Sequence, residues 1–282
     1  MFSVETLKNI AKISIIYTVF FLLIIIFHGL KLSQEIKGGT FIQFSSSENY
    51  LKIKEKLPKV QINSQERYTV ELDSKLETKI EEVKTTIKEI GTIESIQVIG
   101  PSISKYMIKS LITACLAAFL GVFMYVFIRF DLKFSIAGMY AILHDVIACF
   151  FVTAVFNLEL SLMVIVGVLT TIGYSINNTI VVFDKIREGL NPDSKTSVGN
   201  TITSSIQKVF KRSMLTSLST LCAAICIFLF PDKSIQNFAI ITITGIIFGT
   251  FSSLFLSTGI LGIAKINKPK KKKPLSYMHY AS

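Results

Sequence analysis

The sequence has few charged residues for its length. Only 17% of its 282 residues are Asp, Glu, Lys or Arg, whereas half are apolar, and the mean hydropathy is +0.55. Soluble globular domains usually carry about a quarter charged residues. The composition therefore argues against a soluble enzyme and favours a chain whose solvent is largely lipid.

Cysteine is also scarce, and its placement excludes a disulfide framework. All four cysteines lie in apolar runs, where an oxidising compartment would not pair them: Cys115, Cys149, Cys222 and Cys226. Cys222 and Cys226 share one helix face, but two thiols without a third ligand make a poor metal site. We expect buried small residues, no metal site, no cofactor and no catalytic group.

Six apolar runs are long enough to cross a hydrocarbon core of about 30 Å, which takes about 20 helical residues. These runs cover residues 13–30, 107–128, 134–156, 160–183, 213–230 and 238–264. The first is longer than the apolar region of a signal peptide, and no small-x-small cleavage site follows it. The sequence therefore predicts an α-helical polytopic membrane protein with six transmembrane helices, the first of which is an anchor.

Basic residues set the predicted orientation. The N-terminus, 129–133, 184–212 and the tail together carry 16 basic and five acidic residues, whereas the opposite short connections carry one Lys, one Asp and one Glu. Because Lys and Arg stay on the cytoplasmic side, both termini are predicted to be cytoplasmic. The tail, 265–282, contains six lysines. We interpret it as a topology determinant that also attracts anionic lipid, not as a nucleic-acid-binding element.

The hydrophilic segment 31–106 separates the first two spans and is nearly neutral, with 12 basic and 11 acidic residues. Its patterns alternate in the order β-α-β-β-α-β, over 40–45, 48–57, 60–63, 67–72, 74–90 and 94–99. This is the order of a ferredoxin-like split βαβ domain. The segment contains no nucleophile–base pair, so we expect an external binding or force-transmitting module. The predicted parts of the chain are then 1–30, 31–106, 107–264 and 265–282.

Polar residues inside the predicted spans are the candidate functional residues. His144 and Asp145 lie near the middle of the third span, where a charge costs at least about 2.5–3.5 kcal/mol and should face protein or a water-filled cavity. Two interpretations stay open. The pair is either a structural hydrogen bond that fixes helix packing or part of a polar path.

The fourth span carries small and polar residues three and four positions apart: Gly167, Thr170, Thr171, Gly173, Tyr174, Asn177 and Asn178. This spacing predicts that they lie on one helix face, as a packing seam or as one wall of a hydrated passage. Arg212, at the start of the fifth span, either extends to the membrane surface or pairs with a carboxylate. Gly245 and Gly249 form a G-x-x-x-G step typical of helix packing.

Motifs distributed along the whole chain form an ordered series. They are Gly38-Gly39-Thr40, Gly100-Pro101, 125–130 (YVFIRF), His144-Asp145-Val146, 172–188 (IGYSINNTIVVFDKIRE) and Arg212-Ser213. This series resembles the SecF family, the smaller half of the bacterial SecD–SecF export factor. The resemblance covers nearly the whole chain and includes the six-span layout.

The resemblance implies a multi-pass subunit of the bacterial inner membrane that pairs with SecD in a membrane fold like that of RND transporters. The implied partners are SecD, the SecYEG channel and its accessory membrane subunits, the secreted preprotein and membrane lipids. The implied energy source is the proton gradient, and no covalent chemistry is required of the chain. Two other functions stay open: a scaffold that stabilises SecD and the channel without proton coupling, and half of an RND-type exporter of lipids or small molecules.

Two departures from the family pattern concern the implied sites. Asn178 occupies the position of the Asp that the family's fourth-span pattern, Gly-Tyr-Ser-x-Asn-Asp-Thr, uses in proton passage, and an amide does not titrate as a carboxylate does. We expect proton coupling to be weakened here or to use a carboxylate of the partner or Asp145. Before the external domain, Glu35 keeps the acid of the family's Gly-x-Asp-Phe-x-Gly-Gly pattern, and the first Gly and the Phe are absent.

The resemblance thus assigns two groups of residues. The implied polar path consists of His144, Asp145, Tyr174, Asn177, Asn178 and Arg212. The implied motif before the external domain consists of Glu35, Gly38, Gly39 and Thr40, whose glycines allow a tight turn onto the first strand.

Overall fold

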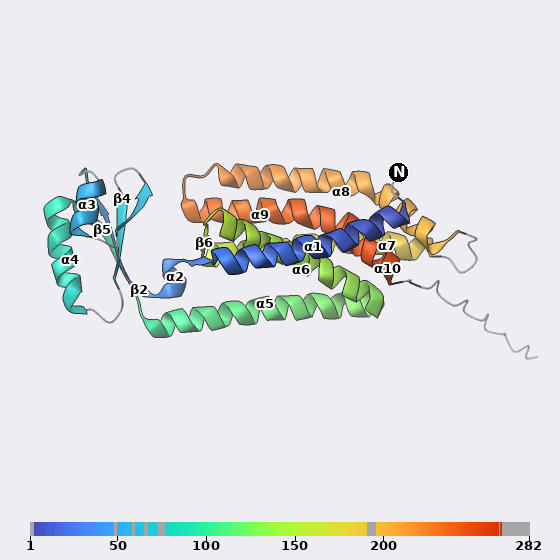
Figure 1. Cartoon of the computed structure of the whole chain (residues 1–282), viewed down its shortest axis with the longest axis horizontal. Helices are drawn as coiled ribbons and strands as arrows, with labels where there is room; N and C mark the ends of the chain where they lie inside the picture. The colour runs from blue at the N-terminus through green and yellow to red at the C-terminus, as the bar shows by residue number, and fades with distance from the viewer. Residues whose placement is uncertain are drawn as a thin grey trace, which may run out of the picture. The chain divides into compact units, whose positions relative to one another are not determined.

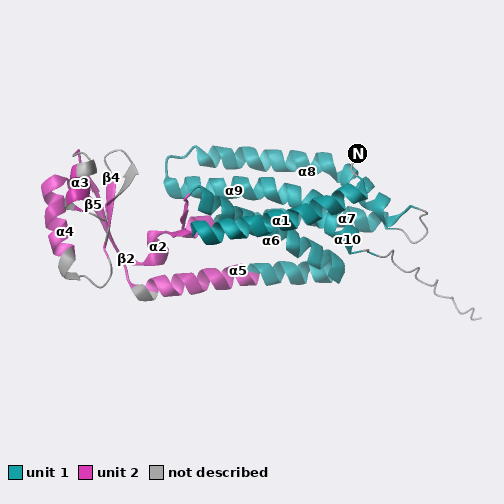
Figure 2. Ribbon diagram, in the orientation of Figure 1, with its two compact units in different colours: residues 1–29, 118–156, 166–282 teal, residues 30–117, 157–165 magenta. Residues whose placement is uncertain are grey.

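A computed structural model describes most of the chain, and most of what it describes is helical (Figure 1). The described residues are 3–47, 50–57, 60–64, 67–72, 77–190, 196–264 and 266. The chain divides into two compact units (Figure 2). One comprises Met1–Gly29, Ala118–Phe156 and Val166–Ser282, and the other comprises Leu30–Ala117 and Asn157–Ile165.

Long helices dominate the first unit and the segments that lead into it. They are α1 (Val4–His28), α5 (Pro101–Arg129), α6 (Leu132–Val155), α7 (Leu162–Gly189), α8 (Val198–Phe228), α9 (Lys233–Phe251) and, after a π-helical turn η1 (Ser252–Leu256), α10 (Ser257–Ile263). Three of them begin at a residue whose side-chain oxygen accepts a hydrogen bond from a first-turn backbone N–H: Ser3 for α1, Ser197 for α8 and Asp232 for α9.

Five helices are long and apolar enough to cross a membrane: Val4–His28, Ile103–Arg129, Leu132–Val155, Leu162–Gly189 and Lys233–Ile263. They coincide with five of the six predicted spans. The remaining predicted span lies in α8, which is 31 residues long but contains Lys208, Lys211 and Arg212 before its apolar half. The chain is therefore a helical protein with five apolar helices of membrane-spanning length among its described residues.

The core of the first unit is centred on aromatic residues from α6, α7 and the turn that precedes α6. The Phe183 side chain is 0% exposed, and its ring lies edge-on to those of Phe130 and Phe134, with centroids 5.7 and 5.1 Å away. Other helices contribute buried side chains to the same cluster, including Leu7, Ile186, Ile202, Ile206, Leu254 and Leu261. By contrast, α1 exposes Ile16 (68%) and Phe27 (86%), as expected for a helix surface in contact with lipid.

The second unit contains a four-stranded antiparallel sheet with two helices. Its elements are β2 (Gly39–Ser45), α3 (Tyr50–Lys56), β3 (Val60–Ser64), β4 (Arg67–Leu72), α4 (Glu77–Ile90) and β5 (Thr92–Ile99), and the strands lie in the order β3-β4-β2-β5. Alternate side chains of the sheet, such as Ile42 and Phe44, pack with Ile53 of α3 and Ile87 of α4. The element order agrees with the sequence pattern.

Some element boundaries differ from the prediction, and three short elements were not predicted. The strand β5 begins at Thr92 instead of residue 94, because a β-bulge at Gln43/Phe44 lets pairing continue to Ser45–Thr92. The start of the predicted helix 74–90 falls partly on residues 73–76, outside the described residues. The additional elements are α2 (Gln34–Lys37) and the parallel pair β1 (Lys31–Leu32) and β6 (Glu159–Leu160).

Candidate functional site

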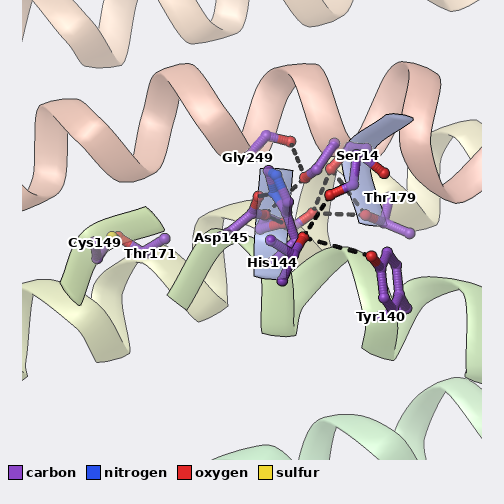
Figure 3. A network of polar contacts seen from close by, with 12 residues as sticks. Ser14, Tyr140, His144, Asp145, Cys149, Thr171, Thr179 and Gly249 are labelled. Carbon is purple, nitrogen blue, oxygen red and sulfur yellow. Dashed lines mark hydrogen bonds and ion pairs between the residues drawn. The ribbon is translucent and has the colours of Figure 1, made fainter. Parts of the chain in front are cut away.

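Asp145 lies at the centre of a buried polar cluster inside the helical unit (Figure 3). Its side chain is 1% exposed. Oδ2 accepts hydrogen bonds from Ser175 Oγ of α7, at 2.6 Å, and from Ser252 Oγ of the π-helical turn, at 2.7 Å. Oδ1 lies 3.2 Å from His144 Nδ1. One carboxylate therefore joins α6 to α7 and to η1.

His144, the preceding residue on α6, faces a different set of helices. Successive residues of an α-helix point about 100° apart, and the His144 ring lies near Phe21 of α1 and Phe248 of α9, with centroids 6.3 and 6.0 Å away. His144 also lines a largely apolar cavity of about 340 Å³, together with Ser14 and Tyr17 of α1. The His144 ring therefore lines the cavity on one side and contacts the buried Asp145 carboxylate through Nδ1.

The polar contacts continue from Asp145 along α7 and η1. Ser253 Oγ donates to the Ser175 carbonyl oxygen at 3.0 Å, and Thr179 Oγ1 lies 2.8 Å from Ser253 Oγ. Both Ser252 and Ser253 are 0% exposed. A π-helical turn widens the helix locally, and such turns are frequent at functional sites. Here the turn places two consecutive serines in contact with α6 and α7.

The polar stripe of α7 lies on one side of the helix, as its spacing predicts, but only part of it is buried within the chain. Gly167, Thr171 and Asn178 are buried within the chain, whereas Thr170, Gly173 and Asn177 are exposed. At about 100° per residue the seven positions fall within an arc of about 160°, less than half of the helix circumference. One edge of this arc is buried in the chain, and the other edge is exposed.

Tyr174 lies between the buried and the exposed edge of this arc and contacts a different helix. Its hydroxyl donates to Ser217 Oγ of α8 at 2.7 Å, and Ser217 Oγ lies 2.7 Å from Thr250 Oγ1 of α9. This contact joins α7, α8 and α9 but shares no residue with the hydrogen bonds of Asp145. Tyr174 consequently belongs to a second, separate polar contact.

Among the described residues, Tyr174, Asn177, Asn178 and Arg212 of the implied polar path form no hydrogen bond with Asp145. Asn178 is 5% exposed, and in the part of the chain that the structure describes its Nδ2 has no hydrogen-bond acceptor. Asn177 and Arg212 are exposed on α7 and α8. The structure thus joins His144 and Asp145 and leaves Asn177 and Arg212 on the outer surface of this chain.

The glycines proposed for packing behave in two ways. A Cβ at Gly245 would lie 2.6 Å from Thr171 Cβ, one at Gly249 would lie 3.2 Å from Ser175 Cβ, and one at Gly167 would lie 3.1 Å from Ile241. These three allow close approach of α7 and α9, and the added Cβ at Gly249 would also lie 3.5 Å from Asp145 Oδ2. At Gly173, an added Cβ would meet no described atom within 4 Å.

The motif Glu35, Gly38, Gly39 and Thr40 lies at the entry to β2, in the second unit. Gly38 (φ 71°) and Gly39 (φ 128°) both have positive φ, which glycine adopts without the steric cost that side chains impose. The Gly38 N–H donates to the Gln34 carbonyl, and Thr40, 3% exposed, is paired with Leu72 and Val98. Glu35 lies in the first turn of α2. These residues form the turn onto the strand.

The sequence does not predict the hydroxyl partners of Asp145. Ser175 belongs to the fourth-span motif, as does Thr179 farther along the cluster, but the motif assigns neither a role, and no sequence pattern singles out Ser252. The two consecutive serines Ser252 and Ser253 within an apolar run are the one sequence feature that could have indicated a polar contact there. Which helix those serines meet depends on tertiary packing, which no local pattern records.

Comparison with known proteins identifies the family. Residues 78–266 match the family model described as protein export membrane protein SecD/SecF, C-terminal. The chain belongs to this family. Among curated relatives, the protein translocase subunit SecF of Rickettsia typhi is 32% identical over 174 residues, covering 62% of this chain and 56% of the relative. That of Borreliella burgdorferi is 37% identical over 132 residues, covering 46% and 43%. The chain thus spans about half the length of these relatives.

Solved structures show the same fold. The crystal structure of SecDF, a translocon-associated membrane protein from Thermus thermophilus, matches with a TM-score of 0.82 at 22% identity, covering 93% of this chain and 38% of that one. A structure of SecDF in its super-membrane-facing form matches with a TM-score of 0.73, also at 22% identity, covering 94% and 39%. The SecD/SecF family chain therefore has the fold of one part of SecDF.

Proposed function

We propose that this chain is the SecF-type membrane subunit of a protein-export machinery and that it works with a SecD partner to assist preprotein translocation. The observation that carries this proposal is the family match over 78–266 together with the SecDF fold. The match covers 38% of the SecDF chain. A SecD partner supplies the remainder, and the SecYEG channel and the preprotein are the further partners. The subunit resides in the bacterial inner membrane and performs no covalent chemistry.

Exposed polar residues on the membrane helices support a SecD interface. Thr170 and Asn177 of α7 and Thr216 and Ser219 of α8 are exposed, although they lie in or beside apolar helices. Polar groups facing lipid are costly, and a second protein relieves that cost. The open space at Gly173 admits a closely approaching helix. In this proposal SecD covers these faces.

In this proposal α8 is the sixth span and the segment 31–106 is an external ferredoxin-like domain, with both termini in the cytoplasm. At 1.5 Å per residue, the 31 residues of α8 extend about 46 Å, more than the hydrocarbon core requires. The strand order β3-β4-β2-β5 with two helices is compatible with a split βαβ domain.

The proton gradient is the proposed energy source, and a buried ionisable pair supports it. Ionisable residues inside membrane spans commonly belong to proton or ion pathways, and His144 and Asp145 lie within α6, 3% and 1% exposed. A second candidate function is a scaffold without proton coupling. Asn178 favours the scaffold, because the family's carboxylate is absent there.

Co-purification and depletion test the export function together. The tagged chain, expressed at its native level, is expected to bring down SecD and SecYEG, and its depletion is expected to make precursor proteins accumulate in the cytoplasm. Depletion with restoration by the plasmid-borne gene is the control. Normal export after depletion, with no SecD in the purified material, would overturn the proposal.

The variant Asn178→Asp tests whether proton coupling in this protein uses a group other than the one at position 178. The variant introduces a titratable group at the position of the family's carboxylate, so the pH dependence of export is expected to change while assembly with SecD persists. Asn200→Asp, at an exposed position in the first turn of α8, is the matched control for an added carboxylate. An unchanged pH profile of the Asn178→Asp variant in an assembled, active complex would remove the support for relocated coupling.

A further inference from the structure

We propose that the cavity between α1, α6 and α9 is a binding site for one acyl chain of a membrane phospholipid, which enters from the bilayer between Ile13, Tyr17 and Phe251. The inference goes beyond the export function, because it requires only that the chain resides in a membrane. It is carried by the position of the cavity on helices of spanning length, by its elongated apolar lining and by the burial of its floor.

The cavity lies entirely on helices that are long and apolar enough to cross a membrane. Its volume is about 340 Å³, and its lining residues come from α1, α6 and α9: Ile10, Ile13, Ser14, Tyr17, Phe21, His144, Phe248 and Phe251. All eight belong to the same compact unit. Because the medium around spanning helices is hydrocarbon, the molecules available to fill an opening on their surface are lipids.

One side of the cavity is open to that medium, and the opposite side is closed by the protein. Three exposed lining residues form what we call the rim: Ile13 (50%), Tyr17 (56%) and Phe251 (42%). Three buried lining residues form what we call the floor: Ser14 (4%), Phe21 (9%) and His144 (3%). A molecule that passes between the rim residues therefore moves from lipid into a site that the helices enclose.

The cavity is elongated along α1. Ile10, Ser14, Tyr17 and Phe21 occupy positions i, i+4, i+7 and i+11, which places them in one row on one face of the helix. At 1.5 Å per residue this row extends about 16 Å along the helix. Acyl chains of a bilayer run roughly parallel to the spanning helices, so a long, narrow site fits a chain. Small-molecule sites have volumes of about 300–1,000 Å³, and the cavity of about 340 Å³ lies at the small end, with room for one chain but not for a whole phospholipid.

The lining offers little to water or to a polar ligand. Ser14 Oγ already donates to the Ala11 carbonyl oxygen at 2.8 Å, and His144 Nδ1 lies 3.2 Å from Asp145 Oδ1. A buried water makes about three hydrogen bonds, whereas cavities lined by residues such as Ile and Phe stay dry and bind apolar molecules. The lining therefore selects a hydrocarbon chain over water.

A bound chain completes the packing between α1 and α9. The rings of Phe21 and Phe248 meet edge-on with centroids 6.0 Å apart, and Phe21 stacks on Phe151 of α6 at 4.2 Å. Farther along the two helices, Tyr17 and Phe251 border the cavity. Atoms that line an unfilled space lose the dispersion contacts that a neighbour would give them. The chain supplies those contacts, and so the lipid acts as a packing element that holds α1 against α9.

Photo-crosslinking with a lipid probe tests the site. The full chain, purified with its SecD partner, is reconstituted into vesicles of phosphatidylethanolamine and phosphatidylglycerol, a fraction of which carries a diazirine in one acyl chain. After irradiation, mass spectrometry is expected to find the label on Phe21 and His144, which are buried and which a chain reaches only inside the cavity. Phe27, 86% exposed on α1, reports the label due to ordinary lipid contact. Label confined to such exposed residues overturns the inference.

A variant with a narrowed cavity shows whether the label depends on this space. Ile13→Trp enlarges a rim side chain and is expected to reduce the label on Phe21 and His144 several-fold. Ile16→Trp is the matched control, because Ile16 is 68% exposed on the same helix and does not line the cavity. The control should keep the label of the wild type. Equal label on the floor residues in wild type and in both variants contradicts the proposal.

The wild-type label decides the question by itself if Ile13→Trp does not assemble with SecD. The adduct on Phe21 or His144 is expected to have the mass of the whole phospholipid probe. Label from a diazirine fatty acid but not from the phospholipid would identify a site for free fatty acid and overturn the proposal. Precursor accumulation on depletion without label on the floor refutes only the lipid site. Label on the floor of a protein whose depletion leaves export normal refutes only the export function.

Discussion

Replacement of Phe183 with alanine is expected to lower the free energy of unfolding of the helical unit by about 3–5 kcal/mol, the range for removing a buried aromatic side chain. Phe183 is 0% exposed, and its ring lies edge-on to Phe130 and Phe134. The substitution removes both aromatic contacts and leaves a cavity that these packed helices cannot fill. Denaturant titration of the detergent-solubilised protein, followed by circular dichroism, measures the change.

The control for this prediction is Phe156→Ala. Phe156 is 67% exposed at the end of α6, so its loss is expected to change the free energy of unfolding by less than about 0.5 kcal/mol. Equal effects of the two substitutions would show that the cluster around Phe183 is not the core of the unit.

Replacement of Gly245 with alanine is expected to destabilise the protein by about 1–3 kcal/mol, as overpacking does. A Cβ at this position would lie 2.6 Å from Thr171 Cβ, an atom that rotation about the Thr171 side chain does not move. The methyl group must therefore push α9 away from α7, beside the contacts of Asp145. Thermal unfolding in detergent, compared with wild type, gives the size of the effect.

A second substitution at Thr171 tests whether the clash with its Cβ causes the loss of stability. In the double variant Gly245→Ala with Thr171→Gly, the clashing Cβ is removed, so part of the lost stability is expected to return. Gly173→Ala, where an added Cβ meets no described atom within 4 Å, should leave the stability unchanged. If the two substitutions of the double variant instead add their separate costs, close approach at Gly245 is not the reason for the loss.

The apolar spans could be predicted because each is a long uninterrupted run, but the ends of the helices could not. Residues 184–212 were predicted to connect two spans, yet α7 continues to Gly189 and α8 begins at Val198. Ser197 caps α8, and Ile202 and Ile206, each 1% exposed, pack into the core. Burial of two isoleucines spaced four apart thus extends the helix through a charged region that hydropathy assigns to a connection.

Of the candidate site, only the ionisable residues could be predicted from the sequence. A carboxylate within an apolar run must face protein, and this argument alone placed Asp145 and His144 in the interior. The partners Ser175 and Ser252 lie 30 and 107 positions away in sequence. Their contact depends on how α6, α7 and η1 pack, and the π-helical turn that presents Ser252 has no local sequence pattern. The division of the α7 stripe likewise follows from packing.

Proton coupling is tested by preprotein translocation into membrane vesicles that contain SecD and SecYEG, with and without this protein, across an uncoupler titration at constant ATP. The stimulation due to this protein is expected to fall to zero as the proton gradient collapses. A stimulation that persists without a gradient would contradict proton coupling and establish a scaffold in its place.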